Sequence, residues 1–162
     1  MSLAQLAAEL LYKTLGRNVK DYTYVDFAAG AGGPTPFIEV GLNARIAAEN
    51  HEPEPDLFTN SDGSVVKRKP PSRRQSNSGP VKFVLTDIHP HIADWTEAAK
   101  KSDNLSFIST PVDATNVPKD LMEDTGKKVF RLYNLAFHHF DDPLALEVLK
   151  NTLETADGFG CV

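Results

Sequence analysis

A glycine-rich turn directly after an aromatic, β-branched segment is the part of this sequence best suited to chemistry. Residues 22–27 (YTYVDF) predict a strand that carries Asp26, and Gly30, Gly32 and Gly33 follow it. Glycines at a strand-to-helix turn let the backbone come close to a ligand. The start of the next helix offers free N–H groups to an anionic group. The turn therefore predicts a site for a nucleoside-type ligand, and a turn that only reverses the chain is the alternative.

Two common nucleotide-binding fingerprints fit this turn poorly. Counted from Gly30, the dinucleotide pattern G-x-G-x-x-G has Thr35 at its third glycine; counted from Ala28, it has alanine at its first. A P-loop is excluded because no Gly-Lys-Ser/Thr follows the glycines. A nicotinamide-dependent oxidoreductase is therefore kept only as an alternative.

Acidic or amide side chains also follow the later predicted strands, which span 81–86, 105–108 and 129–135. Asp87 closes the first of these, and an ionised carboxylate can accept hydrogen bonds from both hydroxyls of a ribose. The alternative for Asp87 is a helix cap before Pro90. Asp113 follows the second of these strands, and Asn134 lies near the end of the third. Because ligands bind beyond the carboxyl ends of parallel strands, we expect these side chains to share one site.

Taken in order, these residues resemble the motifs of class I S-adenosylmethionine-dependent methyltransferases. The first motif of that family, commonly D-x-G-x-G-x-G, reads here, with alanine at its first glycine, Asp26-Phe27-Ala28-Ala29-Gly30-Ala31-Gly32. The resemblance covers residues 22–162 without 51–80. It implies that the loop holds the methionine part of S-adenosylmethionine, with Asp26 orienting the loop or the ammonium group of the cofactor.

The same resemblance assigns roles to the later strand ends. Asp87 would bind the ribose, and Ile88 would lie against the adenine. Asp113 would accept a hydrogen bond from the exocyclic amine of the adenine, with Ala114 beside it. The cofactor-binding set expected from the sequence is Asp26, Ala28, Gly30, Gly32, Asp87, Ile88, Asp113, Ala114 and Asn134.

Methyl transfer from a sulfonium needs alignment more than it needs a base, which is required only for poorly ionised acceptors. His138 and His139 follow the fourth strand of the predicted sheet, and one of them could deprotonate a hydroxyl or an amine. The alternative is that one histidine packs structurally and the other faces solvent. A metal site that also used His89 and His91 is disfavoured by the H-P-H spacing, so we expect no metal.

Strand-like and helix-like segments alternate along the chain and predict an α/β fold. Alternation implies a parallel sheet covered on both faces, hence a three-layer sandwich with a doubly wound, mostly parallel sheet. The resemblance makes this the Rossmann-like methyltransferase fold, lacking the last strands of that family because the fifth strand, 159–162, ends the sequence. The expected helices are 3–15, 37–49, 90–101 and one that is capped by Asp141 or Asp142 and ended by Gly158.

Two of the expected helices carry apolar residues at helical spacing. In the first helix the apolar residues Leu3, Leu6, Ala7, Leu10 and Leu11 follow helical spacing and predict an amphipathic helix packed on the domain. In the last helix the same spacing predicts an inward stripe of Leu144, Ala145, Val148, Leu149 and Thr152.

Residues 1–162 are expected to form one domain, interrupted by a disordered insertion at 51–80 that is rich in proline and polar residues. Its only apolar pairs are Leu57-Phe58 and Val65-Val66. The basic stretch 67–74 within it suggests nuclear import, phosphorylation or a local nucleic-acid contact, with a solvated loop as the alternative.

Composition narrows the class of protein further. The net charge of −5 argues against a dedicated nucleic-acid binder. Cys161 is the only cysteine, which excludes a disulfide framework and a cysteine-based zinc cluster. Neither a signal peptide nor a membrane span is recognisable, so a cytoplasmic location is expected, with a nuclear one left open by the basic stretch.

The sequence thus predicts an S-adenosylmethionine-dependent methyltransferase acting on a small-molecule or protein methyl acceptor. Two alternatives stay open beside it. One is a non-catalytic cofactor-binding or regulatory subunit, in which a protein partner covers the exposed edge of the C-terminal strand. The other is an NAD(P)-dependent oxidoreductase.

Overall fold

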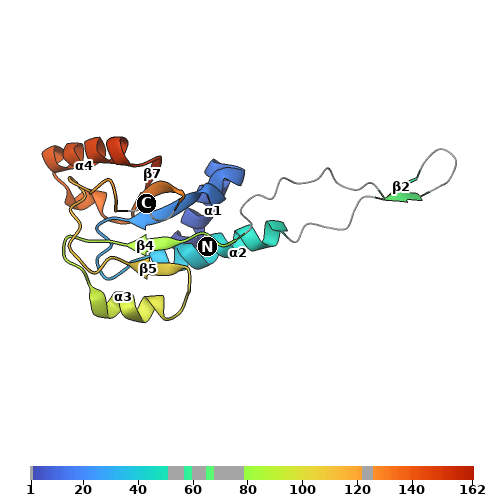
Figure 1. Cartoon of the computed structure of the whole chain (residues 1–162), viewed down its shortest axis with the longest axis horizontal. Helices are drawn as coiled ribbons and strands as arrows, with labels where there is room; N and C mark the ends of the chain where they lie inside the picture. The colour runs from blue at the N-terminus through green and yellow to red at the C-terminus, as the bar shows by residue number, and fades with distance from the viewer. Residues whose placement is uncertain (1, 51–56, 60–64, 68–78, 122–125) are drawn as a thin grey trace.

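The computed structural model describes residues 2–50, 57–59, 65–67, 79–121 and 126–162 (Figure 1). Its helices are α1 (Leu3–Leu15), α2 (Thr35–Asn50), α3 (Ile92–Ala99) and α4 (Asp142–Thr155), with short 3-10 helices η1 (Gly16–Asp21) and η3 (Phe137–His139). Its strands are β1 (Tyr22–Asp26), β2 (Leu57–Thr59), β3 (Val65–Lys67), β4 (Phe83–Leu85), β5 (Leu105–Phe107), β6 (Lys128–Tyr133) and β7 (Gly158–Cys161).

Five of these strands form one parallel sheet in the order β5-β4-β1-β6-β7. Asp26, the last residue of β1, pairs with Leu85 of β4 on one side and with Leu132 of β6 on the other. The chain runs outward from β1 to β4 and β5, then returns to β6 on the opposite side of β1. The strand order therefore reverses between β1 and β6, where open α/β sheets bind their ligands. The predicted α/β class and parallel sheet are confirmed.

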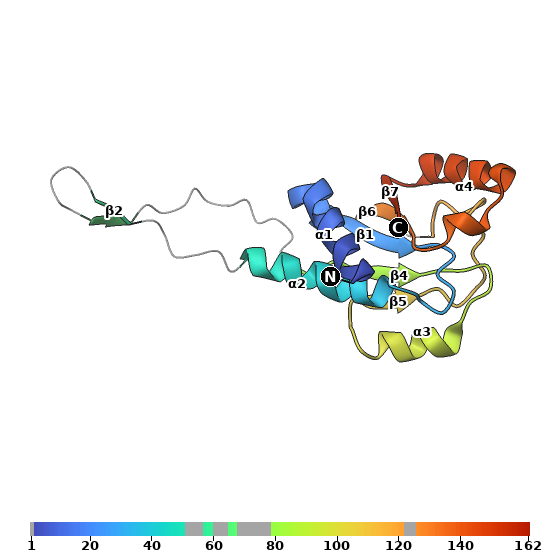
Figure 2. The same cartoon turned by 180° about the vertical axis from the view of Figure 1, so that it is seen from behind.

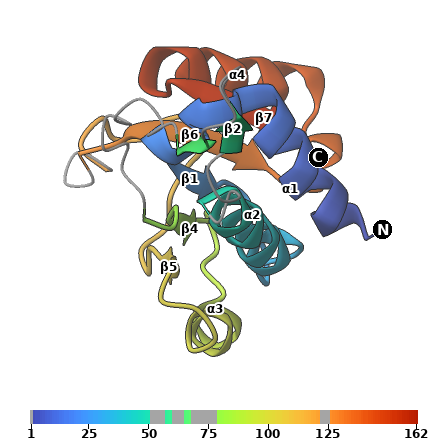
Figure 3. The ribbon, with the colours of Figure 1, turned by 90° about the vertical axis from the view of Figure 1, so that its right-hand side faces the viewer.

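Helices cover both faces of this sheet, as Figures 2 and 3 show. On one face, α1, α2 and α3 bury a core that includes Tyr24, Phe83 and Trp95. On the other face, α4 and the loop after β5 bury Val25, Val84 and Val148 with their neighbours. Alternate residues of β1 and β4 thus contribute to opposite cores, which produces the three layers expected from the sequence.

The expected apolar face of α1 is only partly buried: Ala7 is in the core and Leu11 packs against it. The buried residues of this helix are Ala4, Ala7 and Ala8, whereas Leu3, Leu6 and Leu10 are about half exposed. The helix lies against α2 (Figure 2), where a Cβ atom on Gly41 would be only 3.2 Å from the Cβ of Ala8. Small residues face each other because the two helix backbones are too close to admit leucine.

Helix α4 begins as predicted but ends earlier. The Asp141 carboxylate caps it by accepting a hydrogen bond from the N–H of Leu144 at 2.9 Å. The helix ends at Thr155, and Gly158, expected to end it, instead opens β7. A Cβ atom at Gly158 would lie 2.8 Å from the ring of Phe130, so close packing on β6 requires glycine there. Val148 and Thr152 of the expected stripe are buried, whereas Leu144 is exposed.

The fully buried side chain of Arg131 connects α4 to the sheet. Its guanidinium donates to Asn151 Oδ1 at 2.9 Å and lies 4.5 Å from the centre of the Phe27 ring. It also donates to the hydroxyl of Thr155. These contacts fix the position of α4 over β6.

Two short stretches of the expected insertion are ordered as strands. Leu57–Thr59 pairs antiparallel with Val65–Lys67, so that Phe58 lies opposite Val66. Both apolar pairs noted in the sequence lie within these two strands. Residues 51–56, 60–64 and 68–78, which include most of the basic stretch, lie outside the described residues. Across the described residues, none of the helices has the length and apolar character needed to span a membrane.

Candidate functional site

The backbone of the turn after β1 is strained at Ala28, which stands where the family motif has its first glycine. Ala28 has φ 55°, and Gly30, Gly32 and Gly33 also have positive φ values. For alanine this left-handed conformation costs about 1–2 kcal/mol. The only other non-glycine residue with positive φ in the described chain is Leu135, two residues after β6 ends. Both strained residues thus lie at strand ends beside the switch point, which is where functional sites retain such strain.

Three hydrogen bonds hold the turn against the end of β4 and against α3. The N–H of Gly30 donates to Asp87 Oδ2 at 2.8 Å, and the N–H of Ala29 donates to the carbonyl of Thr86 at 3.1 Å. The indole N–H of Trp95 donates to the carbonyl of Gly30 at 2.8 Å. The turn is therefore positioned before any ligand arrives.

Asp87 accepts two backbone hydrogen bonds in this arrangement. Beside the bond from Gly30, its Oδ1 accepts from the N–H of His89 at 2.8 Å. Asp87 is not the helix cap considered as its alternative role, because α3 begins at Ile92 and its N-cap residue is His91. A carboxylate has about four acceptor positions, so two remain for a ligand.

Beneath the turn, Asp26, Thr35 and Asn134 form a buried polar cluster that joins β1, α2 and the end of β6. The Thr35 hydroxyl donates to Asp26 Oδ2, and Asn134 Nδ2 donates to Thr35 Oγ1 at 2.7 Å. Asp26 Oδ1 and Asn134 Oδ1 are buried and accept no hydrogen bond from the described residues. Two unsatisfied acceptors at a switch point suit a ligand that carries a donor or a positive charge.

Burial raises the pKa of Asp26 from 3.8 to about 7, while the hydrogen bond from Thr35 and the nearby donor groups of Asn134 oppose the rise. The negative charge of nearby Asp87 adds to the rise. A carboxyl group with this pKa changes its charge near neutral pH, so its affinity for a cation changes there too.

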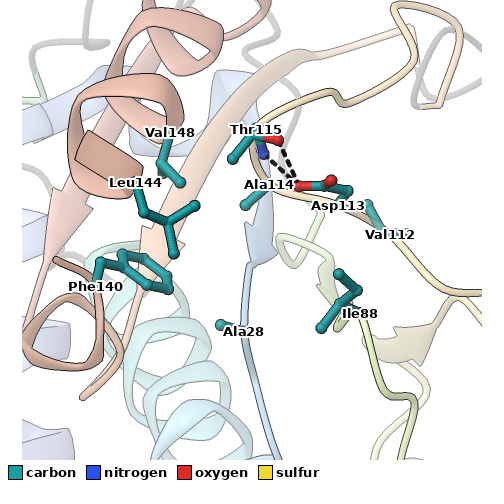
Figure 4. A pocket seen from close by; sticks show the side chains of 9 residues that line it. All are labelled: Ala28, Ile88, Val112, Asp113, Ala114, Thr115, Phe140, Leu144 and Val148. Atoms are coloured by element: carbon teal, nitrogen blue, oxygen red, sulfur yellow. Dashed lines mark hydrogen bonds between the residues drawn. The ribbon is translucent and has the colours of Figure 1, made fainter.

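An apolar cleft opens beside the turn, with a volume of about 130 Å³ (Figure 4). Ala28 lies at one end of it. Ile88 and Val112, from the loops after β4 and β5, form one wall, and Phe140 and Leu144 stand on the opposite side. The cleft is thus lined by four loops and the first turns of α4, all at the carboxyl edge of the sheet.

Asp113 stands at the rim of this cleft with one oxygen already engaged. Its Oδ1 accepts from the backbone N–H of Thr115 at 2.8 Å and from the hydroxyl of Thr115 at 2.7 Å (Figure 4). The N–H of Val112 donates to the carbonyl of Asp87 at 2.9 Å, which ties this loop to β4. The exposed Asp113 side chain therefore has a fixed orientation and a second oxygen for a ligand.

His138 and His139 lie on η3, beside the cleft and not in its lining. Both side chains are exposed, and their ring centres are 3.9 Å apart. Within the described part of the chain, no three histidine, cysteine, aspartate or glutamate side chains gather as a metal site would require.

The structure brings most of the predicted cofactor-binding residues together. Ala28, Ile88, Asp113 and Ala114 line the cleft, Gly30 and Asp87 hydrogen-bond to each other beside it, and Asp26 and Asn134 lie in the polar cluster. Gly32 lies in the same turn, where a Cβ atom would be 3.7 Å from Leu85 and 3.8 Å from Trp95.

Several residues of the site were not predicted from the sequence, namely Thr35, Trp95, Val112, Thr115, Phe140, Leu144 and Val148. The inward stripe predicted for α4 included Leu144 and Val148, but as core residues. Nothing in the sequence indicates that Trp95 reaches across to Gly30, because the two are 65 positions apart.

Comparisons of this chain with family models, curated proteins and solved structures found no match.

Proposed function

We propose that this protein binds S-adenosylmethionine at the carboxyl edge of the sheet and transfers its methyl group to an acceptor. The observation that carries the proposal is the apolar cleft beside the glycine turn, with the carboxylate of Asp113 at its rim. The strand order β5-β4-β1-β6-β7 supports it, because this order creates a switch point at the turn, as in Rossmann-like methyltransferases.

The residues present fit the parts of this cofactor. The apolar side chains of Ile88 and Leu144 suit the two faces of an adenine ring, and the second oxygen of Asp113 can accept from its exocyclic amine. The free acceptor positions of Asp87 suit the ribose hydroxyls. The unsatisfied oxygens of Asp26 and Asn134 suit the ammonium group. When bound, the cofactor supplies an electrophilic methyl group on its sulfonium.

The chain then contributes mainly by holding the cofactor and aligning it with the acceptor. Trp95 and Asp87 fix the glycine turn, so little ordering of the backbone is needed on binding. His138 and His139 are exposed near the site and can take a proton from a hydroxyl or amine acceptor. The proposed acceptor is a small molecule or a protein side chain, because both histidines of η3 are exposed.

One observation favours a second candidate function, a cofactor-binding subunit without catalysis. Neither histidine lines the cleft, and the two rings lie against each other. β7 also lies at an edge of the five-stranded sheet, where a protein partner could pair with it. In this case S-adenosylmethionine would bind without turnover.

Calorimetric titration with S-adenosylmethionine and S-adenosylhomocysteine tests the binding step. Asp113→Asn keeps an oxygen for Thr115 but turns an amide donor toward the adenine amine, so we expect affinity to fall about tenfold. Asp120→Asn, at an exposed position away from the cleft, is the matched control. Absence of binding at millimolar cofactor, or tighter binding of NADH, would refute the proposal. Conversion of bound cofactor to S-adenosylhomocysteine by cell extract then separates the enzyme from the non-catalytic subunit.

A further inference from the structure

A second cavity, of about 350 Å³, lies between α2 and α3. It is on the face of the sheet that α1, α2 and α3 cover, and it shares no lining residue with the apolar cleft. Ala31 and Gly33 of the glycine turn form one end of it. Phe37 and Val40 of α2 and Leu105 of β5 give it apolar walls. The proposed function leaves this cavity without a role.

A buried carboxylate with one unsatisfied oxygen lines the cavity. Glu39 is only 2% exposed, and its Oε1 accepts from Asn43 Nδ2 at 2.7 Å. Asn43 is itself fixed, because it bonds both the N–H and the carbonyl of Val81 at 2.8 and 3.1 Å. Glu39 Oε2 is buried and has no hydrogen-bond partner among the described residues. An acceptor left in this state is costly unless a ligand supplies a donor.

The other charges around the cavity are exposed and mostly paired. Glu97 is 2.6 Å from the ammonium of Lys100, and Asp94 is 3.6 Å from His91 Nδ1. Exposed pairs of this kind contribute little energy in water. Lys101 is the one basic residue in the lining and is exposed. The buried charge that a ligand would meet is therefore the carboxylate of Glu39, beside apolar walls.

We propose that this cavity binds a primary alkylammonium ion. The ammonium group donates to Glu39 Oε2, and the alkyl chain packs on Phe37 and Val40, both of which are largely exposed without it. A divalent metal fits the cavity less well, because calcium and magnesium need several oxygen ligands and a single buried carboxylate supplies few. An anion fits the cavity less well, because it offers no hydrogen-bond donor to Glu39 Oε2. This inference does not depend on the proposed function.

Calorimetric titration with n-pentylammonium tests the proposal, with 1-pentanol as the uncharged probe of matched shape. We expect n-pentylammonium to bind and 1-pentanol to bind at least about tenfold more weakly. Glu39→Gln retains an oxygen for Asn43 but loses the carboxylate. It should lower the affinity for n-pentylammonium by about tenfold or more. Glu97→Gln, which alters an exposed carboxylate of the rim, should change affinity less than about twofold.

Phe37→Ala provides a second variant at an exposed position where folding is not at risk, and it should weaken binding about threefold through lost apolar contact. Thermal melting of each variant verifies that it is folded. The proposal is overturned if n-pentylammonium fails to bind the folded wild-type protein, if Glu39→Gln binds it equally well, or if 1-pentanol binds as tightly. Each readout is independent of S-adenosylmethionine, so failure here leaves the proposed function untouched.

Discussion

At the scale of single residues, the buried cluster under the glycine turn is the most unusual feature of the molecule. Asp26 and Asn134 each keep one buried oxygen without a donor, although Thr35 links them through hydrogen bonds. Such unsatisfied acceptors reduce stability in the free protein. They are accounted for if a ligand with a donor completes the cluster.

The raised pKa of Asp26 predicts a specific dependence of stability on pH. Because burial raises this pKa from 3.8 to about 7, the folded protein retains a proton that the unfolded chain loses above about pH 4. The contribution of Asp26 to the free energy of unfolding therefore falls as pH rises through this window, and it stays low above about pH 7. Asp26→Asn has no charge to bury. The free energy of unfolding of Asp26→Asn minus that of wild type should therefore increase by about 2 kcal/mol when the pH is raised from 5 to 8.

Urea denaturation of wild type and Asp26→Asn at the two pH values measures this difference. Asp120→Asn, which removes an exposed carboxylate, is the control and should shift little. A stability difference between Asp26→Asn and wild type that does not change with pH would contradict the assigned pKa.

The strain at Ala28 predicts a stabilising substitution. Ala28→Gly relieves a left-handed backbone that costs alanine about 1–2 kcal/mol, but glycine also loses about 0.4–1 kcal/mol through the flexibility of the unfolded chain. We expect the free energy of unfolding to rise by about 0.5 kcal/mol. Ala29→Gly, at a neighbour without positive φ, should be destabilising. Chemical denaturation distinguishes the two, and equal losses of stability would argue against strain at Ala28.

At the scale of elements, the site is assembled by loops that are bonded to one another and to α3. The loop after β4 holds the glycine turn through Asp87, and it holds the loop after β5 through the bond from Val112 to the Asp87 carbonyl. Helix α4 supplies the opposite side of the cleft and is fixed to β6 by Arg131. Displacement of β6 would therefore alter the cleft through α4.

The packing of β7 on β6 predicts that an alanine is tolerated less well at Gly158 than at Gly160 of the same strand. A Cβ atom at Gly158 would lie 2.8 Å from Phe130, whose ring is packed edge-on against Tyr22 and has little room to shift. Gly158→Ala should lower the free energy of unfolding by about 1–3 kcal/mol. At Gly160 the nearest atom would be 3.4 Å away, so Gly160→Ala should cost less. Thermal unfolding of both variants tests this. A larger loss of stability in Gly160→Ala than in Gly158→Ala would contradict the register of β7 on β6.

Elements with a distinct local sequence pattern could be predicted from the sequence. Aromatic and β-branched runs that end at Asp26 and Asp87 identified two strands, and Asp141 with Pro143 identified the start of α4. The buried face of α1 could not be predicted, because it depends on how closely α2 approaches at Gly41, which is a tertiary property.

At the scale of the whole molecule, strand order explains why residues distant in sequence meet at one cleft. Ala28, Ile88, Asp113 and Ala114 were predicted together because parallel strands present their carboxyl ends at one edge. The exposure of His138 and His139 depends instead on the path of the chain through η3, for which the sequence carries no clear signal. The second cavity likewise arises from the separation of α2 and α3, and only a structure reveals it.

An adenosine-bearing cofactor is proposed to occupy the apolar cleft beside the glycine turn. Amide chemical-shift mapping by NMR during titration with S-adenosylhomocysteine tests this binding site most directly. We predict the largest shifts at the amides of Ala28, Gly30, Ile88 and Ala114, with little change at Val40 and Ala98 in the second cavity. Saturating shifts confined to other regions, or no shifts from folded protein at millimolar ligand, would contradict it.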